Sequence, residues 1–151
     1  VAASTGSQDA VVIVGCDSML EIDGRTVGKP VDASEAHERW RTMSGNTGTL
    51  HTGHFLVRSS DGSTAEGVSS AIIRFGSPSQ AEIEAYIDSG EPLWCAGAFT
   101  IDGLGGAFIE GIDGDPHGVV GISLPLLRRL LADLGVRWTD LWTPPADRGT
   151  D

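Results

Sequence analysis

The sequence lacks three features that each mark a class of proteins: paired cysteines, a long apolar run and an excess of basic residues. Its two cysteines, Cys16 and Cys95, are far apart and form no Cys-x-x-Cys pair, so we interpret them as buried thiols in a reducing cytoplasm. No stretch approaches the roughly 18 consecutive apolar residues of a membrane-spanning helix. Residues 1–10 show no basic segment followed by an apolar run, so no secretory signal is recognisable. The sequence therefore predicts a cytoplasmic protein with no membrane partner.

Basic residues are outnumbered by acidic ones. The chain has 10 Lys and Arg against 21 Asp and Glu, which gives a net charge of -11. The negative electrostatic field of such a protein repels the phosphates of a nucleic acid, so nucleic acid is not an expected partner. A small anionic substrate remains compatible with it, provided that a metal ion and a few cations focus positive potential locally.

What is present is the pattern of an α/β protein of one domain. The 151 residues, 40% of them apolar, suit a single compact core. Alternation and β-branched runs predict strands at 11–14 (extended by 19–22), 25–27, 51–58, 66–75, 96–101 and 107–112. Helical spacing with caps predicts helices from 32 to a stop at 45, from 79 to a stop at 90, and over 123–134.

The order of these elements predicts how the chain is organised. Strands and helices alternate and Asp23-Gly24 is a strong hairpin signal, so we expect a mixed, partly antiparallel sheet flanked by helices. The domain is expected to occupy residues 1–138. Residues 139–151 are rich in proline and are expected to form a flexible tail.

Asp17 has the most informative position of any ionisable residue. Val11–Val14 are apolar and β-branched, which is typical of a strand buried on both faces. A carboxylate directly after such a strand lies where open α/β sheets bind ligands, and it can bind a divalent metal or accept a proton from water. From the pattern alone, an aspartate that caps a turn or helix is an equally good interpretation.

Lys29 is the second candidate. It stands in a Gly-Lys-Pro turn just beyond the hairpin, which can bring its ammonium back towards Asp17, where it would suit phosphate binding. Taken alone, it would more often be a solvated surface lysine. His51 and His54 are three apart on an expected strand and therefore point to opposite faces, a poor arrangement for a shared metal. Residues 103–106 are glycine-rich but no helix follows them, so we expect a tight strand connection rather than a phosphate cradle.

Several blocks of the sequence, in order, resemble the Maf family of nucleotide pyrophosphatases. The blocks that carry the resemblance are Val11–Ser18 (VVIVGCDS), Gly28–Pro30, Met43–Gly45, Thr52-Gly53, Ile83–Pro92, Ala96–Phe99, Gly103–Gly106 and Val119–Leu126. They extend from about residue 11 to 135, so chance agreement is a poor explanation.

The resemblance implies a reaction and a set of site residues. It implies hydrolysis of a nucleoside triphosphate to the monophosphate and pyrophosphate, with a divalent cation such as Mg²⁺ or Mn²⁺. Asp17 would be the proton acceptor and lie at the metal, and Lys29 would contact the phosphates. Ser18 and Asp102 would help to select the base.

Three departures from the family pattern bear on that implication. The family opens with a strand and a Ser-rich, Arg-containing phosphate loop, which residues 1–10 do not resemble, so we expect this segment to be lacking. Thymidine- and uridine-type members carry Thr at the position of Ser18 and Gln at that of Asp102, so the base preference stays open. Asn46 and Gly48 stand where a basic residue and a histidine are common.

A function of another class is also open. The same resemblance includes an association with division arrest, so the alternative is a nucleotide-binding regulator of cell division with little turnover. A homodimer is the default expectation for a soluble protein of this kind.

Overall fold

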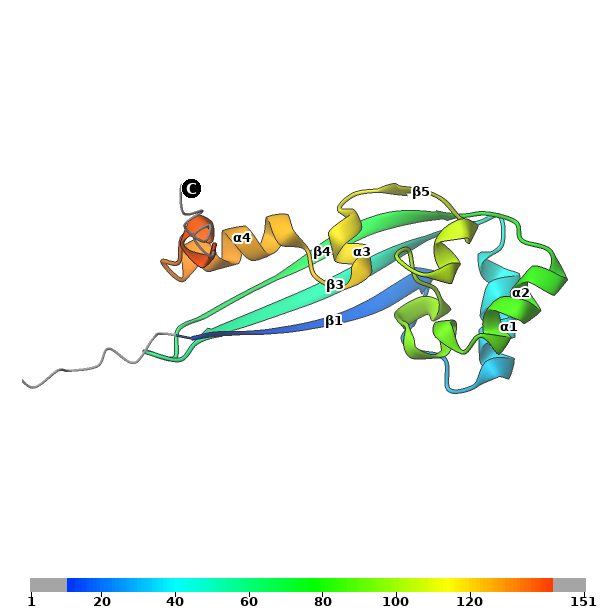
Figure 1. The fold of residues 1–151 in the computed structure, drawn as a ribbon, viewed down its shortest axis with the longest axis horizontal. Coiled ribbons are helices and arrows are strands. Elements are labelled where there is room, and N and C mark those ends of the chain that lie inside the picture. Colours follow the sequence, from blue (N-terminus) through cyan, green and yellow to red (C-terminus); the bar gives the residue numbers. More distant parts are fainter. Residues whose placement is uncertain (1–10, 143–151) are drawn as a thin grey trace, which may run out of the picture.

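Three long strands form the spine of the molecule in the computed structural model, which describes residues 11–142 (Figure 1). The sheet consists of β1 (Val12–Ile22), β2 (Arg25–Val27), β3 (Thr47–Arg58), β4 (Thr64–Phe75) and β5 (Ile109–Asp113). The strands lie in the order β2-β1-β3-β4-β5, and each neighbouring pair is antiparallel. The predicted α/β class with a partly antiparallel sheet is confirmed. Within residues 11–142 no parallel pair accompanies it, because β1–β2 and β3–β4 are hairpins, whose tight turns reverse the chain.

The first hairpin turns where the sequence indicates. Asp23 and Gly24 both have positive φ, at 48° and 68°, which is the backbone that a two-residue hairpin turn requires. The strands predicted at 51–58 and 66–75 are β3 and β4, and each begins earlier than expected, at Thr47 and Thr64.

The described helices are α1 (Ala33–Met43), α2 (Gln80–Asp88), α3 (Pro116–Val120) and α4 (Leu124–Asp133). The three predicted helices are confirmed as α1, α2 and α4, and their caps are formed. Asp32 accepts a hydrogen bond from the amide of Glu35, and Ser79 and Glu82 make a reciprocal capping box. The short α3 was not predicted. None of the described helices is long and apolar enough to cross a membrane.

The strand predicted at 96–101 is wrong. Residues 91–108 instead form three short 3₁₀ turns: Glu91–Trp94, Ala96–Ala98 and Leu104–Phe108. Gly97 and Ala98 have left-handed φ of 74° and 61°, which breaks an extended run. The kink is held from both sides, because the amide of Gly97 donates to the carbonyl of Gly28 and the Trp40 indole donates to that of Ala98.

The molecule is elongated, and the two halves of the sheet have different surroundings (Figure 1). At one end, here called the helical end, α1, α2 and the 3₁₀ turns pack around the buried Trp40. At the other, the ribbon end, the outer halves of β1, β3 and β4 carry α4 on one face through a cluster of leucines. That cluster consists of Leu56, Leu126, Leu127, Leu130, Leu131 and Leu134.

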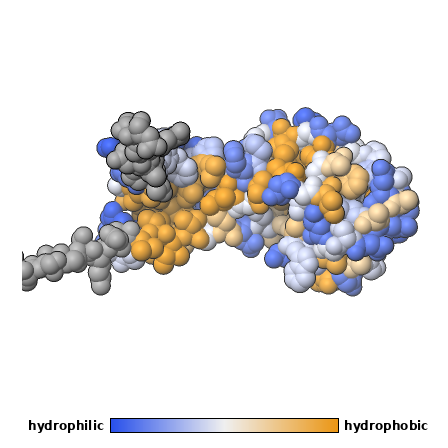
Figure 2. Space-filling view, in the orientation of Figure 1, coloured by the Kyte–Doolittle hydropathy of each residue, from blue (hydrophilic) through white to orange (hydrophobic). Residues whose placement is uncertain are grey.

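The expectation that residues 11–14 are buried on both faces is also wrong. Val11 and Ile13 are 55% and 60% exposed. The reason is that β2 pairs only with Leu20–Ile22, so the first half of β1 is an edge in the described structure, and α4 covers just one face of the ribbon. Figure 2 shows hydrophobic side chains gathered at the surface of the ribbon end beside α4.

Part of the predicted tail, residues 139–142, lies within the described residues. Its first residues belong to the 3₁₀ turn Trp138–Leu141, and residues 143–151 lie outside the described residues, as do residues 1–10.

Candidate functional site

A cavity of about 240 Å³ lies where the helical and ribbon ends meet, and it gathers all four residues singled out in the sequence. Asp17 and Ser18 come from β1, Lys29 from the loop after β2, and Asp102 from the loop after the second 3₁₀ turn. The rest of its lining consists of Cys16, Leu50, Trp94, Cys95, Ala96, Phe99, Thr100, Val119, Val120 and Gly121.

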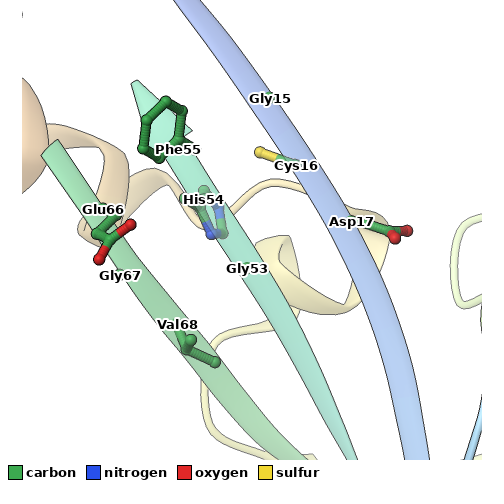
Figure 3. Close-up of a pocket in the computed structure, with 9 residues that line it drawn as sticks. All are labelled: Gly15, Cys16, Asp17, Gly53, His54, Phe55, Glu66, Gly67 and Val68. Atoms are coloured by element: carbon green, nitrogen blue, oxygen red, sulfur yellow. The ribbon is translucent and has the colours of Figure 1, made fainter. Parts of the chain in front are cut away.

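Asp17 reaches the cavity differently from what its sequence position suggests. It was expected just after a strand, but β1 continues through it to Ile22, so Asp17 lies in mid-strand opposite Gly53. Figure 3 shows its carboxylate projecting outward from the β1 edge. Within residues 11–142 that edge is unpaired, so the carboxylate is exposed, and its one hydrogen bond there is from the amide of Ser18 to Oδ1, at 2.9 Å. Its remaining lone pairs are available to a ligand.

Lys29 is held by its backbone rather than by its side chain. Arg39 of α1 donates to the carbonyls of both Gly28 and Lys29, and the amide of Gly97 donates to the Gly28 carbonyl at 3.0 Å. The exposed ammonium is therefore carried on a turn fixed from two sides. Nothing in the sequence pointed to Arg39 except its helical spacing from Glu35, with which it pairs; its reach to the turn depends on tertiary packing.

A chain of hydroxyls fixes Ser18. The Thr52 hydroxyl lies 2.8 Å from the Ser18 hydroxyl and 2.8 Å from the carbonyl of Gly118 in α3. Thr52 has one hydroxyl hydrogen and donates it to that carbonyl, so Ser18 must donate to Thr52. Ser18 therefore presents an acceptor oxygen, and no donor, to the cavity.

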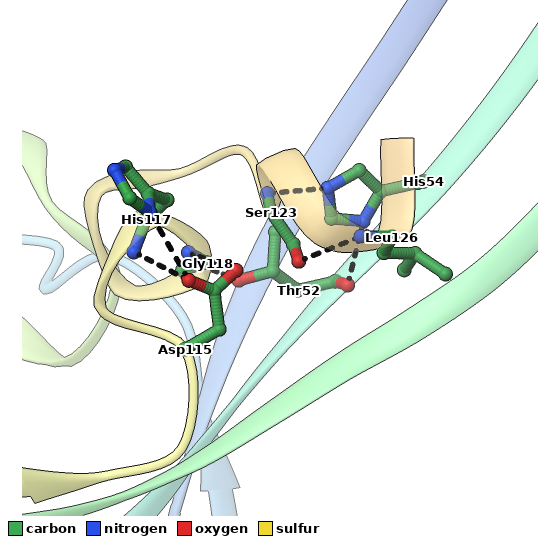
Figure 4. A network of polar contacts seen from close by, with 7 residues as sticks. All are labelled: Thr52, His54, Asp115, His117, Gly118, Ser123 and Leu126. Atoms are coloured by element: carbon green, nitrogen blue, oxygen red, sulfur yellow. Dashed lines mark hydrogen bonds and ion pairs between the residues drawn. The ribbon is translucent and has the colours of Figure 1, made fainter. Parts of the chain in front are cut away.

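The same network anchors the far wall of the cavity (Figure 4). The buried His54 lies between the Thr52 carbonyl, 3.0 Å from Nδ1, and the Ser123 amide, which donates to Nε2 at 2.8 Å. The ring is thus neutral with its proton on Nδ1. Asp115 caps α3, and although burial alone would raise the pKa of its carboxyl, hydrogen bonds from Ser123, His117 and Gly118 outweigh it and lower that pKa. These contacts hold α3 against β3.

The two histidines of β3 point to opposite faces, as predicted. His54 is 3% exposed on the α4 side, while His51 lies on the other face between Ser70 and Glu21. In the described part of the chain no cluster of three or more His, Cys, Asp or Glu side chains is placed to hold a metal. Two exposed carboxylates in one cavity, Asp17 and Asp102, still suit Mg²⁺, which binds one or two protein carboxylates and takes its other ligands from water and phosphate.

The cysteines are free thiols, as predicted, but their expected burial is wrong for Cys16. It is exposed on the edge half of β1, and Cys95 is half-buried. Both line the cavity.

A second, larger hollow of about 750 Å³ lies on the face of the ribbon opposite α4 (Figure 3). It forms because Gly15 and Gly53 have no side chains where their neighbours on the same face, Phe55 and Val68, stand out from the sheet. Asp17 borders both hollows. We identify the smaller cavity as the candidate site because it alone of the two combines a lysine, two carboxylates and hydroxyl groups.

Comparison with known proteins gives consistent matches. Residues 1–134 match the family model described as Maf-like protein. The nucleoside triphosphate pyrophosphatase of Streptomyces coelicolor is 51% identical over 147 residues, covering 97% of this chain and 71% of the relative. That of Streptomyces avermitilis is 55% identical over 144 residues (95% and 69%), and that of Salinispora tropica is 54% identical over 139 residues (92% and 60%). The chain thus spans between 60% and 71% of the length of these three relatives.

Proposed function

This chain belongs to the Maf-like protein family, and from that premise we propose that it is a nucleoside triphosphate pyrophosphatase. It would hydrolyse a nucleoside triphosphate to the monophosphate and pyrophosphate and so clear non-standard or surplus nucleotides. The observation that carries the proposal is the convergence of Asp17, Ser18, Lys29 and Asp102 on one cavity from three separate segments. The alternative, a regulator with little turnover, is not favoured, since the similar relatives bear the name of an enzyme.

Asp17 is the proposed proton acceptor. An exposed carboxylate can take the proton of a water that attacks the phosphate chain. Its mid-strand position fixes the backbone, so the carboxylate has little freedom beyond its own rotamers. A divalent cation, Mg²⁺ or Mn²⁺, held by Asp17 would offset the charge of the triphosphate.

Lys29 is the proposed phosphate contact. In a chain of net charge -11, an anionic substrate needs a local cation, and among the described residues Lys29 is the lysine or arginine that lines this cavity. An ammonium there stabilises the charge that develops on the leaving pyrophosphate. The contacts from Arg39 and Gly97 keep its turn in place.

Ser18 and Asp102 are proposed to select the base, and both offer acceptors. Ser18 has donated its hydrogen to Thr52, and a carboxylate group at Asp102 offers acceptor oxygens. Edges of bases that carry amino or imino hydrogens therefore suit this cavity better than carbonyl edges do.

Pyrophosphate release from a panel of nucleoside triphosphates, with Mg²⁺ or Mn²⁺, tests the proposal. Asp17→Asn is expected to lower the rate by about 10²- to 10⁴-fold, the usual contribution of a general base. Asp133→Asn, an exposed change at the end of α4, is the matched control and should keep the wild-type rate. Nucleotide binding is followed separately by the fluorescence of Trp94, which is 77% exposed in the cavity wall. Binding without release by the wild-type chain would reject the enzyme and support the regulator.

A further inference from the structure

The glycine-rich loop after the second 3₁₀ turn is wrapped around a carboxylate of the protein itself. Glu91 Oε1 accepts hydrogen bonds from the Thr100 hydroxyl at 2.6 Å, the Gly105 amide at 3.0 Å and the Tyr86 hydroxyl at 3.0 Å. Its Oε2 accepts the Leu104 amide at 2.9 Å. One side chain thus takes four donors: the Thr100 hydroxyl, the amides of Leu104 and Gly105, and the Tyr86 hydroxyl of α2.

The glycines of this loop allow the wrapping. A Cβ at Gly103 would lie 2.5 Å from Glu91 Oε2, and one at Gly105 would lie 2.3 Å from the Tyr86 hydroxyl. Any side chain at either position would displace the carboxylate or its donor. The sequence suggested a tight connection between strands here; the structure shows an internal anion site that the backbone amides of the loop form.

Glu91 stays ionised and Tyr86 stays protonated around neutral pH. Partial burial alone would raise the pKa of Glu91, but the hydrogen bonds from Thr100, Leu104 and Gly105 outweigh it and hold that pKa at about 2. Burial raises the pKa of Tyr86, so its hydroxyl remains a donor. The carboxylate is therefore ionised, and its acceptor capacity is in use.

The loop that Glu91 ties down is the one that carries Asp102. Thr100 and Leu104, both bonded to the same carboxylate, stand on either side of Asp102 in the chain, and Thr100 itself lines the cavity. Trp94, which ends the 3₁₀ turn that Glu91 begins, and the next residue, Cys95, also lie in the cavity wall.

We propose that Glu91 is a positioning residue for nucleotide recognition, which sets the backbone of residues 100–104 so that Asp102 faces the base. The proposal rests on the proposed function of the cavity. Glu91 acts through the loop, whereas Asp17 is fixed independently on β1. Loss of Glu91 should therefore weaken nucleotide binding and base selection more than it slows turnover.

The test compares Glu91→Gln with wild type in KM, kcat and the ratio of kcat/KM between preferred and disfavoured bases. Gln replaces one acceptor oxygen with an amide group that cannot accept from Leu104 or Gly105. We expect KM to rise by about 10- to 100-fold, since a small misplacement of a binding group has effects of that order, and the base ratio to fall towards one. The kcat should change by less than KM does. Glu84→Gln, on the exposed side of α2, is the matched control, since the hydrogen bond of this carboxylate is to its helix neighbour Gln80.

A second variant guards against misfolding of the first. Tyr86→Phe keeps the ring in the core and removes one of the four donors, so it should shift KM and the base ratio in the same direction by a smaller factor. Thermal melting establishes that each variant is folded. The proposal is overturned if Glu91→Gln is folded and keeps the KM and base ratio of the wild type. If Glu91→Gln does not fold, the proposal is overturned when Tyr86→Phe keeps both wild-type values.

Failure of the proposed function gives a different result. If the wild-type chain releases no pyrophosphate, binding of a non-hydrolysable nucleoside triphosphate analogue, read by Trp94 fluorescence, takes the place of KM. Weaker binding and lost base discrimination in Glu91→Gln would still support its positioning role, and unchanged binding would reject it.

Discussion

The helical end and the ribbon end share the same three strands, yet they are stabilised in different ways. At the helical end the sheet packs under α1, α2 and the 3₁₀ turns, and Trp40 makes edge-to-face contacts with Phe75, Tyr86 and Phe108 at centroid distances of 6.1, 5.8 and 5.7 Å. At the ribbon end α4 covers one face with leucines, and the other face is open. The first core has 14 buried hydrophobic members and the second six, so most of the stabilisation lies at the helical end.

The candidate cavity lies between these ends, with one wall from the helical end and the other from α3. Lys29, Trp94 and Asp102 belong to the helical end, whereas Val119 and Val120 of α3 are tied to the middle of β3. A site at this boundary lies beside a well-packed core, and hydrogen bonds hold its opposite wall, α3, on the sheet. Such an arrangement is suited to admitting a ligand without exposing the core.

The largest effect is expected from Trp40→Ala at the helical end. Trp40 is fully buried and its indole holds the Ala98 carbonyl, so its loss removes packing and a hydrogen bond together. The free energy of unfolding should fall by about 3–5 kcal/mol. Urea unfolding measures it, and Trp94→Ala, which truncates a mostly exposed tryptophan, should change stability little. Equal losses from the two variants would contradict the assignment of the main core.

Leu130→Ala makes the corresponding change at the ribbon end. Leu130 is 4% exposed in the α4 cluster, and we expect a loss of about 2–3 kcal/mol, towards the lower limit for buried leucines because the thin layer can partly collapse. Hydrogen exchange should show faster exchange across α4 and unchanged protection in α1. Leu141→Ala, at a 56% exposed site, is the control. If protection fell equally in α1, the two ends would be one cooperative unit and the comparison would be wrong.

The same contrast explains which elements the sequence could predict. Strands β3 and β4 and helices α1, α2 and α4 carry periodic patterns and local caps, such as Ser79 with Glu82, and these signals lie within the element itself. The turns over residues 91–108 depend on left-handed backbone at Ala98, which distant groups impose, so no local pattern indicated them. The exposure of Val11–Val14 depends on which strands lie beside β1, and a run of apolar residues does not predict its neighbouring strands.

The site was predictable to a similar degree. Asp17 and Lys29 stand out because a charged residue beside a β-branched run and a lysine in a turn are visible locally, and resemblance to a family added Ser18 and Asp102. The groups that position them, Arg39, Thr52 and Glu91, were not found, since each acts on residues at least nine positions away along the chain.

A change of intermediate size is expected in how the free energy of unfolding depends on pH. One carboxylate at each end, Glu91 and Asp61, allows the two ends to be compared. Glu91 at the helical end has a pKa of about 2 against an ordinary 4.5, and Asp61 at the ribbon turn has a lowered pKa through hydrogen bonds from Arg58 and Ser63. A carboxyl whose pKa is lower in the folded state adds stability above its unfolded pKa and loses it as pH falls towards the folded value. Stability from Glu91 should therefore be complete above about pH 4.5 and decline between there and pH 2.

Glu91→Gln should reduce the free energy of unfolding at pH 7 by about 1–2 kcal/mol and flatten its decline between pH 4.5 and 2. Asp61→Asn should have a smaller effect, because its pairing with Arg58 is exposed and is screened by salt. Urea unfolding across this pH range, at low and high salt, measures both. An equally steep acid decline in Glu91→Gln would show that other carboxylates account for it.

The smallest effect is expected on the open face of the ribbon, from Val68→Thr. Val68 is 65% exposed beside the glycine-lined hollow, and threonine keeps the β-branched shape that suits a strand. The free energy of unfolding should change by less than about 0.5 kcal/mol, as for other surface substitutions. The same type of change at Ile73, which is fully buried at the helical end of the same strand, should cost several times more and serves as the positive control. A loss above about 1 kcal/mol at Val68, or one that grows with protein concentration, would mean that this face is covered in solution. In that case the ribbon end has a second packed face, and the difference between the two ends is smaller than the monomer suggests.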